Sequence, residues 1–385
     1  MRIGIDAQLA AAGNRTGLYT QLRRVVGAVR PLAGDRVWLL ADAAANRPPL
    51  GRADAAVLAA AFDGAKVRLP PRRGYRVWHR LSRCNRVDVL VHNLHGVLPR
   101  ATRGANVYVV PDVIPLAFDY GDPDFAAPYR PFYEAARHAD AVVVWSEHTK
   151  ADFLARVGGD PGRVRVCPLA AGPEFRPMAR AEVEPVLARH GLADAPYVLF
   201  VSTVEPRKNH AGLVRGFARA VAADPALPHR LVLVGKPWLG GAELFDLVRA
   251  LGLGDRVRHL GFVDDLPPLY AGAAAFAFPS FYEGFGLPPL EAMAAGVPVL
   301  AAAASSLPEV VGDAGVLFDP HDDRAIADAL LRVLTDPAAR ADLAARGLAR
   351  AARFSWDRTA AQYLAAFRAG YDRFAGRRPA ARGGG

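Results

Sequence analysis

The sequence is poor in cysteine. Its 385 residues include two, Cys84 and Cys167. Two cysteines cannot build the disulfide framework of a small secreted domain. Neither cysteine stands at zinc-finger spacing from a second cysteine or a histidine. We therefore expect both to be ordinary thiols, buried or partly buried in the folded chain.

The sequence also lacks a long hydrophobic run. No uninterrupted apolar stretch reaches the roughly 18 residues that a membrane-spanning helix needs. The start, MRIGIDA, has a charge and a strand-like pattern where a secretory signal needs an apolar core. We therefore expect a cytoplasmic protein. Its apolar content of 52% and charged content of 22% are typical of globular chains, and its length favours two domains.

Acidic residues are scarce in one region, between Arg68 and Arg103. This segment contains nine arginines and a single acid, Asp88, in a chain of net charge +10. It is either a solvated arginine-rich surface or a face that meets anionic lipid or a phosphate-bearing acceptor, which would place the protein on the inner face of the membrane. A nucleic-acid site is the third interpretation. No recognition-helix, zinc-finger or RNP pattern supports it, so we expect no nucleic-acid partner.

Short apolar, β-branched runs alternate with helix-like segments along the chain. In the first half the expected strands are Arg2–Asp6, Arg36–Leu40, Val87–Val91, Asn106–Val110, Ala141–Trp145 and Val164–Cys167. In the second half they are Tyr197–Ser202, Arg230–Gly235, Val257–Leu260, Ala274–Pro279, Val297–Ala301 and Gly315–Phe318. Expected helices include Gly212–Ala222, Ala242–Leu251 and Ala325–Leu334. The alternation predicts an α/β protein with two Rossmann-like, doubly wound domains that face each other across a cleft.

The pattern breaks near the sequence AGPEFRPMARAEVEPVL, which has three prolines and no strand. We place the first domain at residues 1–175 and the second at 176–354. Residues 355–376 follow as a helix that packs back on the first domain. Its apolar stripe consists of Trp356, Tyr363, Leu364, Phe367, Tyr371 and Phe374. We expect the Gly-rich tail, residues 377–385, to be disordered.

The segment Pro279–Gly296 combines the features of a ligand loop. A strand ends at Pro279, a loop carries Gly284 and Gly286, and a helix follows that ends at Gly296. The glycines allow a ligand to approach the backbone, and a helix N-terminus suits a diphosphate. Glu283 lies in the loop. We place Glu291 in the first turn of the helix, where it could also serve only to stabilise the helix dipole.

A second loop, in Tyr197–Gly212, has the same design. A strand runs into the turn VEPRKNH, which contains the adjacent cations Arg207 and Lys208, and a helix follows. Arginine binds phosphate with two prongs and lysine binds it as a point charge. The turn is therefore either an anion site or a solvated surface turn. Because both loops end strands of one predicted parallel sheet, they should lie at the same edge.

These strings resemble a known family. FPSFYEGFGLPPLEAMAAGVPVL, followed by SSLPEVVGDAGVLFDP, is similar to the donor-site signature of the family-4 retaining glycosyltransferases, in which seven residues separate two glutamates. STVEPRKNH resembles that family's second donor motif. MRIGIDA, DAVVVWSEHTKADF and PEFRP extend a weaker resemblance over nearly the whole chain. The resemblance implies the GT-B arrangement, with an N-terminal acceptor domain and a C-terminal donor domain.

The resemblance implies a role for each matched residue. Glu283 would contact the donor sugar and stabilise charge on its ring, Arg207 and Lys208 would neutralise the leaving diphosphate, and Glu291 would bind the ribose. The other implied donor-binding residues are Gly284, Phe285, Gly286, Leu287, Ser202 and Gly235. No metal and no cofactor is implied besides a GDP- or UDP-linked sugar as donor. Asp122 and Asp124 have Asp-x-Asp spacing, but we expect a turn there.

The first half matches the family less well. Gly17 lies in a loop after the first strand that either approaches a ligand or is an ordinary surface turn. In YVVPDVIPL, Asp112 is in place but Pro111 stands where the family often has histidine. His92 and His95, in VHNLHGVLP, are candidates to replace that histidine. We expect Gly17, Asp112 and His95 on the acceptor side.

The implied activity is that of a metal-independent, retaining hexosyltransferase. The donor sugar would be mannose, and the acceptor a polysaccharide, a glycolipid or another lipid-linked glycan. One alternative is a non-catalytic subunit that binds a nucleotide sugar or a glycan. Another is a different two-Rossmann nucleotide-sugar enzyme, such as an epimerase. The transferase hypothesis predicts that Glu283→Ala and Lys208→Ala lower turnover by orders of magnitude and leave thermal melting near wild type.

Overall fold

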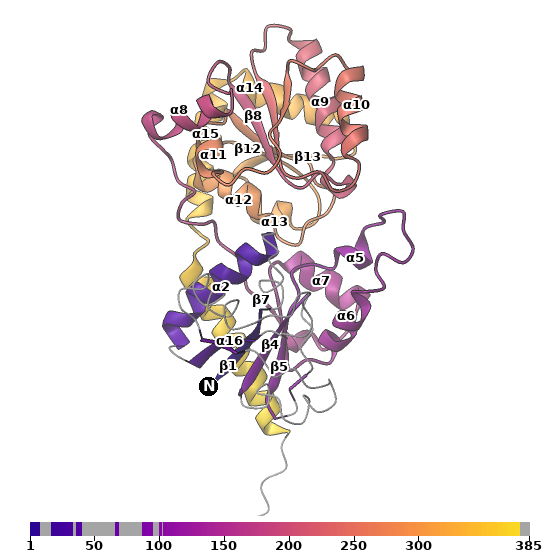
Figure 1. The fold of residues 1–385 in the computed structure, drawn as a ribbon, viewed down its shortest axis with the longest axis vertical. Helices are drawn as coiled ribbons and strands as arrows, with labels where there is room; N and C mark the ends of the chain where they lie inside the picture. The colour runs from indigo at the N-terminus through magenta and orange to yellow at the C-terminus, as the bar shows by residue number, and fades with distance from the viewer. Residues whose placement is uncertain are drawn as a thin grey trace, which may run out of the picture. The chain divides into compact units, whose positions relative to one another are not determined.

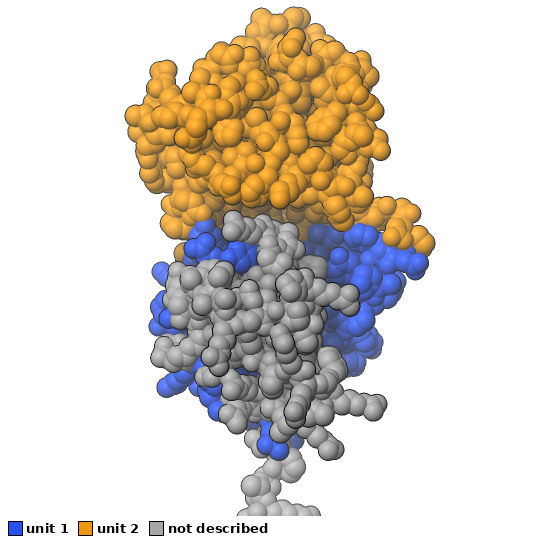
Figure 2. All heavy atoms as spheres, viewed as in Figure 1, with its two compact units in different colours: residues 1–115, 124–168, 356–385 blue, residues 116–123, 169–355 orange. Residues whose placement is uncertain are grey.

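The computed structural model describes residues 1–7, 17–33, 36–40, 66–68, 87–94, 100–101 and 103–377. The chain divides into two compact units, coloured in Figure 2. Unit 1 contains residues 1–115, 124–168 and 356–385, and unit 2 contains residues 116–123 and 169–355. The division after Pro168 precedes the boundary placed at residue 175. One short segment, Leu116–Pro123, belongs with unit 2 although the first half of the sequence contains it.

Unit 1 is built on a parallel sheet of seven strands in the order β3-β2-β1-β4-β5-β6-β7. The strands are β1 (Ile3–Asp6), β2 (Val37–Leu40), β3 (Lys66–Arg68), β4 (Val89–Asn93), β5 (Ala105–Val109), β6 (Ala141–Val144) and β7 (Val164–Val166). The six strands expected here are confirmed, with ends shifted by one or two residues. The edge strand β3 was missed because its three residues, KVR, carry two charges and no apolar run.

Unit 2 repeats the plan with six parallel strands in the order β10-β9-β8-β11-β12-β13. They are β8 (Tyr197–Val201), β9 (Arg230–Val234), β10 (Val257–His259), β11 (Ala275–Phe278), β12 (Val299–Ala302) and β13 (Gly315–Phe318). All six were expected. The chain reverses its direction of winding between β8 and β11, which are hydrogen-bonded neighbours. Doubly wound sheets bind ligands at this switch point, beyond the carboxyl ends of the strands.

Helices cover these sheets because apolar residues recur at helical spacing. The α/β class with two doubly wound domains is thus confirmed. Unit 1 contains α2 (Gly17–Ala33), α6 (Arg130–Arg137), α7 (Glu147–Arg156) and α16 (Trp356–Gly376), and the short α5 (Ile114–Ala117) spans the division. Unit 2 contains α8 (Arg180–Arg189), α9 (His210–Ala223), α10 (Gly241–Ala250), α11 (Pro267–Ala271), α12 (Leu287–Ala294), α13 (Leu307–Val311), α14 (Asp323–Leu334) and α15 (Pro337–Ala351).

The C-terminal helix α16 packs on the sheet of unit 1, against α2, β5 and β6 (Figure 1). Tyr363 and Phe367 are each 1% exposed, and the Tyr363 hydroxyl accepts a 2.8 Å hydrogen bond from Trp145 Nε1. Tyr371 is 37% exposed, so including it in the apolar stripe was wrong. Tyr371 lies eight residues beyond Tyr363, about 80° further round the helix, and therefore at the edge of the face that Tyr363 and Phe367 bury.

Cys167, just after β7, is buried as expected, and burial raises the pKa of its thiol to about 12. Cys84 lies outside the described residues, as do 378–385 in the tail that we expect to be disordered. Most of Arg68–Arg103 also lies outside them. Among the residues described, no helix is long and apolar enough to cross a membrane.

Gly235 directly follows β9, at a point where two backbones meet. Its φ is +145°, and a Cβ placed there would lie 1.9 Å from the carbonyl oxygen of Ser202. We predict that Gly235→Ala destabilises unit 2 by about 3 kcal/mol or more, because it adds both a clash and backbone strain. Its melting temperature should fall by roughly 6–12 °C in calorimetry. Gly254→Ala is the control, since nothing lies within 4 Å of the corresponding Cβ. Equal melting of the two variants would contradict the prediction.

Candidate functional site

Two loops meet at the switch point of unit 2. One follows β8 and covers residues 202–209, and the other follows β11 and covers residues 279–286. The Phe281 N–H donates to the Arg207 carbonyl at 2.9 Å, and Asn209 Nδ2 donates to the Pro279 carbonyl at 3.3 Å. Asn209 adopts a left-handed conformation (φ 56°) and caps α9 through the Gly212 N–H. The expectation that the loops share one edge of the sheet is thus correct.

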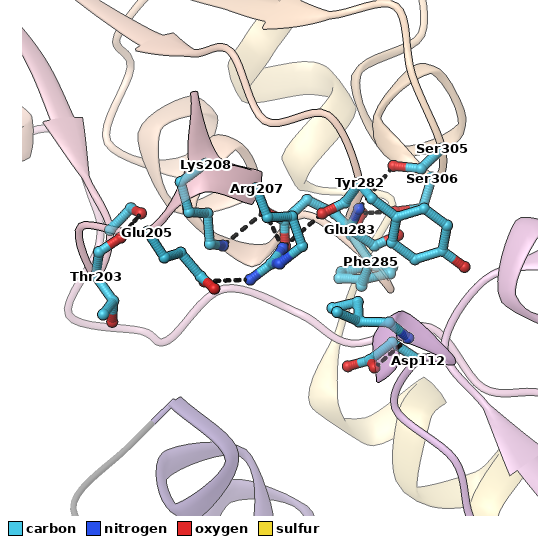
Figure 3. A network of polar contacts seen from close by, with 12 residues as sticks. Asp112, Thr203, Glu205, Arg207, Lys208, Tyr282, Glu283, Phe285, Ser305 and Ser306 are labelled. Atoms are coloured by element: carbon cyan, nitrogen blue, oxygen red, sulfur yellow. Dashed lines mark hydrogen bonds and ion pairs between the residues drawn. The ribbon is translucent and has the colours of Figure 1, made fainter. Parts of the chain in front are cut away.

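Glu283, Arg207 and Lys208 converge in the space between these loops (Figure 3). One carboxylate oxygen of Glu283, Oε1, lies 2.6 Å from Lys208 Nζ and 3.0 Å from Arg207 Nη1. The three side chains are 8–13% exposed. The structure therefore brings together the three residues expected to carry the chemistry. It joins them as a buried ion cluster and not as a solvated turn.

The charges in this cluster set one another's protonation. Burial favours the neutral acid at Glu283, but the positive charges of Lys208 and Arg207 outweigh it and lower the pKa of the carboxyl. Burial also lowers the pKa of Lys208, and the charge of Arg207 adds to that effect. For Arg207, Glu283 and Glu205 outweigh burial and raise the pKa further. Glu283 is therefore an ionised carboxylate at neutral pH, able to stabilise positive charge next to it.

The backbone of Glu283 is held by two serines from the turn before α13. The Glu283 N–H donates to Ser305 Oγ at 2.8 Å, and the Ser306 hydroxyl lies 2.9 Å from the Glu283 carbonyl oxygen. Ser305 is left-handed (φ 51°), and among the described residues Asn209 is the one other non-glycine with positive φ. Both strained residues thus hold the ion cluster, a placement typical of functional sites.

Sequence reasoning did not assign a role to Glu205 or Tyr120. Glu205 Oε1 lies 2.6 Å from Arg207 Nη2, and its side chain is 6% exposed. The Tyr120 hydroxyl donates to Glu205 Oε2 at 2.7 Å and accepts from Arg207 Nε at 3.2 Å. Glu205 stands in the VEPRKNH turn itself, so an acid two residues before the cations was the available signal. Tyr120 is 85 residues away in sequence from Glu205 and gave no such signal.

The helix after the Glu283 loop differs from the expectation in one respect. α12 begins at Leu287, so Glu291 lies beyond its first turn, which contains no acid. The position predicted for Glu291, and the dipole role that depended on it, were therefore wrong. Its carboxylate instead accepts from the Tyr270 hydroxyl at 3.2 Å. Gly286, just before the helix, is left-handed (φ 106°). The first three helical residues are Leu287 and two prolines, so only Leu287 among them has a backbone N–H to offer a ligand.

The remaining donor-side residues line the same edge or support it. Ser202 and Gly235 directly follow the paired ends of β8 and β9. The Ser202 hydroxyl donates to the Thr203 carbonyl at 2.8 Å. Phe285 is buried against Phe354, with ring centroids 6.0 Å apart. Gly284, next to Glu283, is buried in the same loop.

The candidate residues from the first half of the sequence lie in unit 1 or outside the residues that the structure describes. Asp112 follows β5, and its Oδ1 accepts the Ile114 N–H at 2.9 Å. Gly17 is the first residue of α2, and His95 lies outside the described residues. His92 is 3% exposed, donates to Asn106 Oδ1 at 3.0 Å and has a pKa lowered to about 4 by burial. His92 is therefore a neutral core residue of β4 and no substitute for the missing histidine.

Asp122 and Asp124 are both exposed in a segment of turns, as expected. Within the described ranges, no group of three or more histidine, cysteine, aspartate or glutamate side chains is arranged to hold a metal ion. The charged centre of unit 2 thus combines acids with arginine and lysine. Such a set suits an anionic ligand with a polar, hydroxyl-bearing portion.

Comparison with known proteins finds a family model that matches the part of the chain around this site. The family model described as "Glycosyl transferases group 1" matches residues 187–350, which include both site loops. O-antigen chain mannosyltransferase B of Escherichia coli is 38% identical over 238 residues, covering 61% of this chain and 62% of that protein. D-inositol 3-phosphate glycosyltransferase of Salinispora arenicola is 39% identical over 246 residues, covering 60% of this chain and 55% of that protein. The chain thus spans less than two thirds of either relative.

Solved structures match over nearly the whole chain. Anabaena Alr3699/HepE, in a complex with UDP and glucose, superposes with a TM-score of 0.75 at 22% identity and covers 95% of this chain and 98% of that one. WaaG, described as a glycosyltransferase involved in lipopolysaccharide biosynthesis, has a TM-score of 0.70 at 17% identity, with 94% and 98% covered. At such identities the match establishes the fold, which is GT-B, as the resemblance implied.

Proposed function

We propose, from the premise that residues 187–350 form a glycosyl transferases group 1 domain, that the protein is a glycosyltransferase. It moves a hexose from a nucleotide diphosphate donor to a glycan or lipid-linked acceptor of polysaccharide synthesis. The observation that carries the proposal is the buried cluster of Glu283 with Arg207 and Lys208 at the switch point of unit 2. A carboxylate for the sugar and cations for the leaving diphosphate are what transfer requires.

We propose mannose as the sugar. Relatives named as mannosyltransferases support this choice, among them the O-antigen chain enzyme and the serotype-specific mannosyltransferase WbdA of Escherichia coli, 33% identical over 263 residues. The named complex of Alr3699/HepE with UDP-glucose supports the rival donor. The donor-binding set then comprises Ser202, Gly235, Glu291 and the loop Gly284–Leu287, where the glycines admit the sugar and phosphate close to the backbone.

A thermal-shift screen tests donor binding. GDP-mannose, UDP-glucose, ADP-glucose and dTDP-glucose are each added at increasing concentration to the full chain. The matching donor should stabilise the protein by about 2.7 kcal/mol at a hundred times its dissociation constant, and the others should have little effect. The same assay with the free nucleoside diphosphates identifies the base. If no nucleotide shifts the melting, the proposed donor site is wrong.

The reaction is proposed to retain the anomeric configuration and to need no metal. The acceptor hydroxyl attacks on the face that the diphosphate leaves, and a phosphate oxygen takes its proton. Positive charge within this cluster supplies what a metal would otherwise provide. NMR of the product should give the donor's anomeric configuration, and EDTA should leave the rate unchanged. An inverted product, or activity that returns only with added Mg²⁺ or Mn²⁺, would contradict this mechanism.

Two rivals are separated by acceptor dependence. An epimerase converts the nucleotide sugar without releasing nucleotide, and a non-catalytic subunit binds it without consuming it. A transferase releases nucleoside diphosphate faster when acceptor is present.

On the acceptor side, we propose Gly17, His95 and Asp112. We also propose that Arg68–Arg103 contacts anionic lipid, which flotation with phosphatidylglycerol vesicles tests against neutral vesicles.

A further inference from the structure

Arg207 has almost no capacity left for a ligand. A guanidinium group has five N–H donors, and hydrogen bonds from Arg207 go to four acceptors in unit 2. Nε donates to Tyr120, Nη2 to Glu205, and Nη1 to both the Tyr282 carbonyl and Glu283, at distances of 2.5–3.2 Å. A guanidinium that is 8% exposed and surrounded in this way cannot bind a diphosphate through two parallel hydrogen bonds unless it first loses some of these partners.

Lys208 differs from its neighbour in this respect. An ammonium group has three donors, and in the described part of the chain Lys208 makes one hydrogen bond, to Glu283 Oε1 at 2.6 Å. Its Nζ also lies 5.2 Å from the centre of the Phe278 ring. Two N–H groups of Lys208 thus remain for an incoming anion.

Glu205 also changes the charge that a diphosphate meets. Glu205 and Glu283 together balance Arg207 and Lys208, so the four groups sum to zero. Two adjacent cations in the sequence suggest a strongly positive pocket. The buried carboxylate of Glu205, which precedes them in the loop after β8, cancels one of these positive charges. Attraction for the diphosphate is therefore local to the free face of Lys208.

We propose that Arg207 is a positioning residue, locked by Glu205 and Tyr120 so that it orients the Glu283 carboxylate, and that Lys208 is the cation that binds the leaving diphosphate. This inference rests on the proposed function and divides its charged centre into two roles. Glu205 and Tyr120 become positioning residues of the same site. They touch neither sugar nor phosphate and act through Arg207.

The segment 116–123 is what delivers Tyr120 to unit 2. Phe118 stacks on Phe281 of the Glu283 loop, with centroids 6.5 Å apart, and the ring of Tyr120 packs against Trp238 at 6.0 Å. Burial raises the pKa of the Tyr120 phenol, so the hydroxyl stays protonated and continues to donate to Glu205. The hydroxyl can therefore bridge Glu205 and Arg207 at any physiological pH.

The test separates diphosphate affinity from turnover in three variants of the full chain: Lys208→Met, Tyr120→Phe and Glu205→Gln. Calorimetry gives the dissociation constants of GDP and UDP and, for reference, of GMP and UMP. Turnover is the release of GDP from GDP-mannose or of UDP from UDP-glucose. Tyr371→Phe, exposed on α16, and Lys150→Met, on α7 with its side chain 30% exposed, are the matched controls, and melting is recorded for every variant.

Lys208→Met should weaken diphosphate binding roughly 10- to 100-fold, the range of one charge-assisted hydrogen bond, and leave monophosphate binding nearly unchanged. Tyr120→Phe should lower turnover about 10-fold with diphosphate affinity within about twofold of wild type. Glu205→Gln should lower turnover and tighten diphosphate binding, because it removes a negative charge. A merely structural role for Glu205 or Tyr120 would weaken both properties together.

Three outcomes decide the matter. If Tyr120→Phe weakens diphosphate binding as much as Lys208→Met does, Arg207 is itself a diphosphate ligand and the inference is overturned, while the proposed function stands. Looser diphosphate binding by Glu205→Gln overturns it equally. If wild type binds none of the four nucleotides, the proposed function fails and the inference falls with it.

Discussion

Glu283→Gln is expected to lower the rate of sugar transfer by a factor of about 10²–10³. The substitution keeps the shape of the side chain and removes its negative charge, so it isolates the electrostatic contribution. Glu283 is held by Lys208, Arg207 and the two serines of the following turn, and a preorganised carboxylate stabilises a cationic ring without reorienting. Initial rates with the donor from the thermal-shift screen measure the effect. Glu243→Gln, exposed on α10, is the control and should transfer at the wild-type rate.

The same substitution should also destabilise the protein, contrary to the melting near wild type that the sequence suggested for Glu283→Ala. With Glu283 neutral, Lys208 loses the one carboxylate it contacts in the described chain, and breaking a buried ion pair costs about 3–5 kcal/mol. Calorimetry at neutral pH measures this loss. Melting unchanged from wild type would mean that the cluster is solvated in solution and is not a buried charged centre.

The pH dependence of that loss follows from the pKa of Glu283. The cations lower this pKa in the folded state from its ordinary value of 4.5. A carboxyl with a lowered folded pKa stabilises the protein above its unfolded pKa, and this stabilisation disappears as pH falls through the folded value. The stability gap between wild type and Glu283→Gln should therefore be full near neutral pH and narrow once the pH drops below about 4.5. A gap that is constant across this range would exclude an ionic origin.

Local patterns in the sequence were sufficient for most of the fold and half of the site. Apolar runs predicted twelve strands because a strand in a doubly wound sheet is buried on both faces. The edge strand β3, short and charged, lacks that pattern. Glu283, Arg207 and Lys208 were found because each stands in a loop that ends a central strand, and the topology brings those loops together.

The other half of the site depends on contacts that no local pattern contains. Tyr120 reaches Glu205 from a segment that the sequence places with the other unit, and Ser305 reaches Glu283 from the turn before α13. Both are ordinary polar residues in ordinary turns. Their role becomes visible only in the folded chain, where separate segments of the sequence are brought next to the loops that follow β8 and β11. For the same reason Arg207 and Lys208 looked equivalent in the sequence. Their adjacency does not reveal that the hydrogen-bond donors of Arg207 are already used by other residues of the protein.

A loss of stability as large as that of Glu283→Gln is expected in the other unit, at Tyr363 of α16. Tyr363→Ala leaves a cavity beside Phe367 and removes the acceptor of the Trp145 N–H, so unit 1 should lose about 3–5 kcal/mol. Tyr371→Ala, two turns along the same helix and 37% exposed, should change stability by less than about 1 kcal/mol. Since two units can melt separately, hydrogen exchange in peptides covering β6 and α16 is the appropriate measurement. Faster exchange in Tyr363→Ala alone would establish that α16 completes the core of unit 1, whereas equal protection in both variants would reduce it to a surface helix.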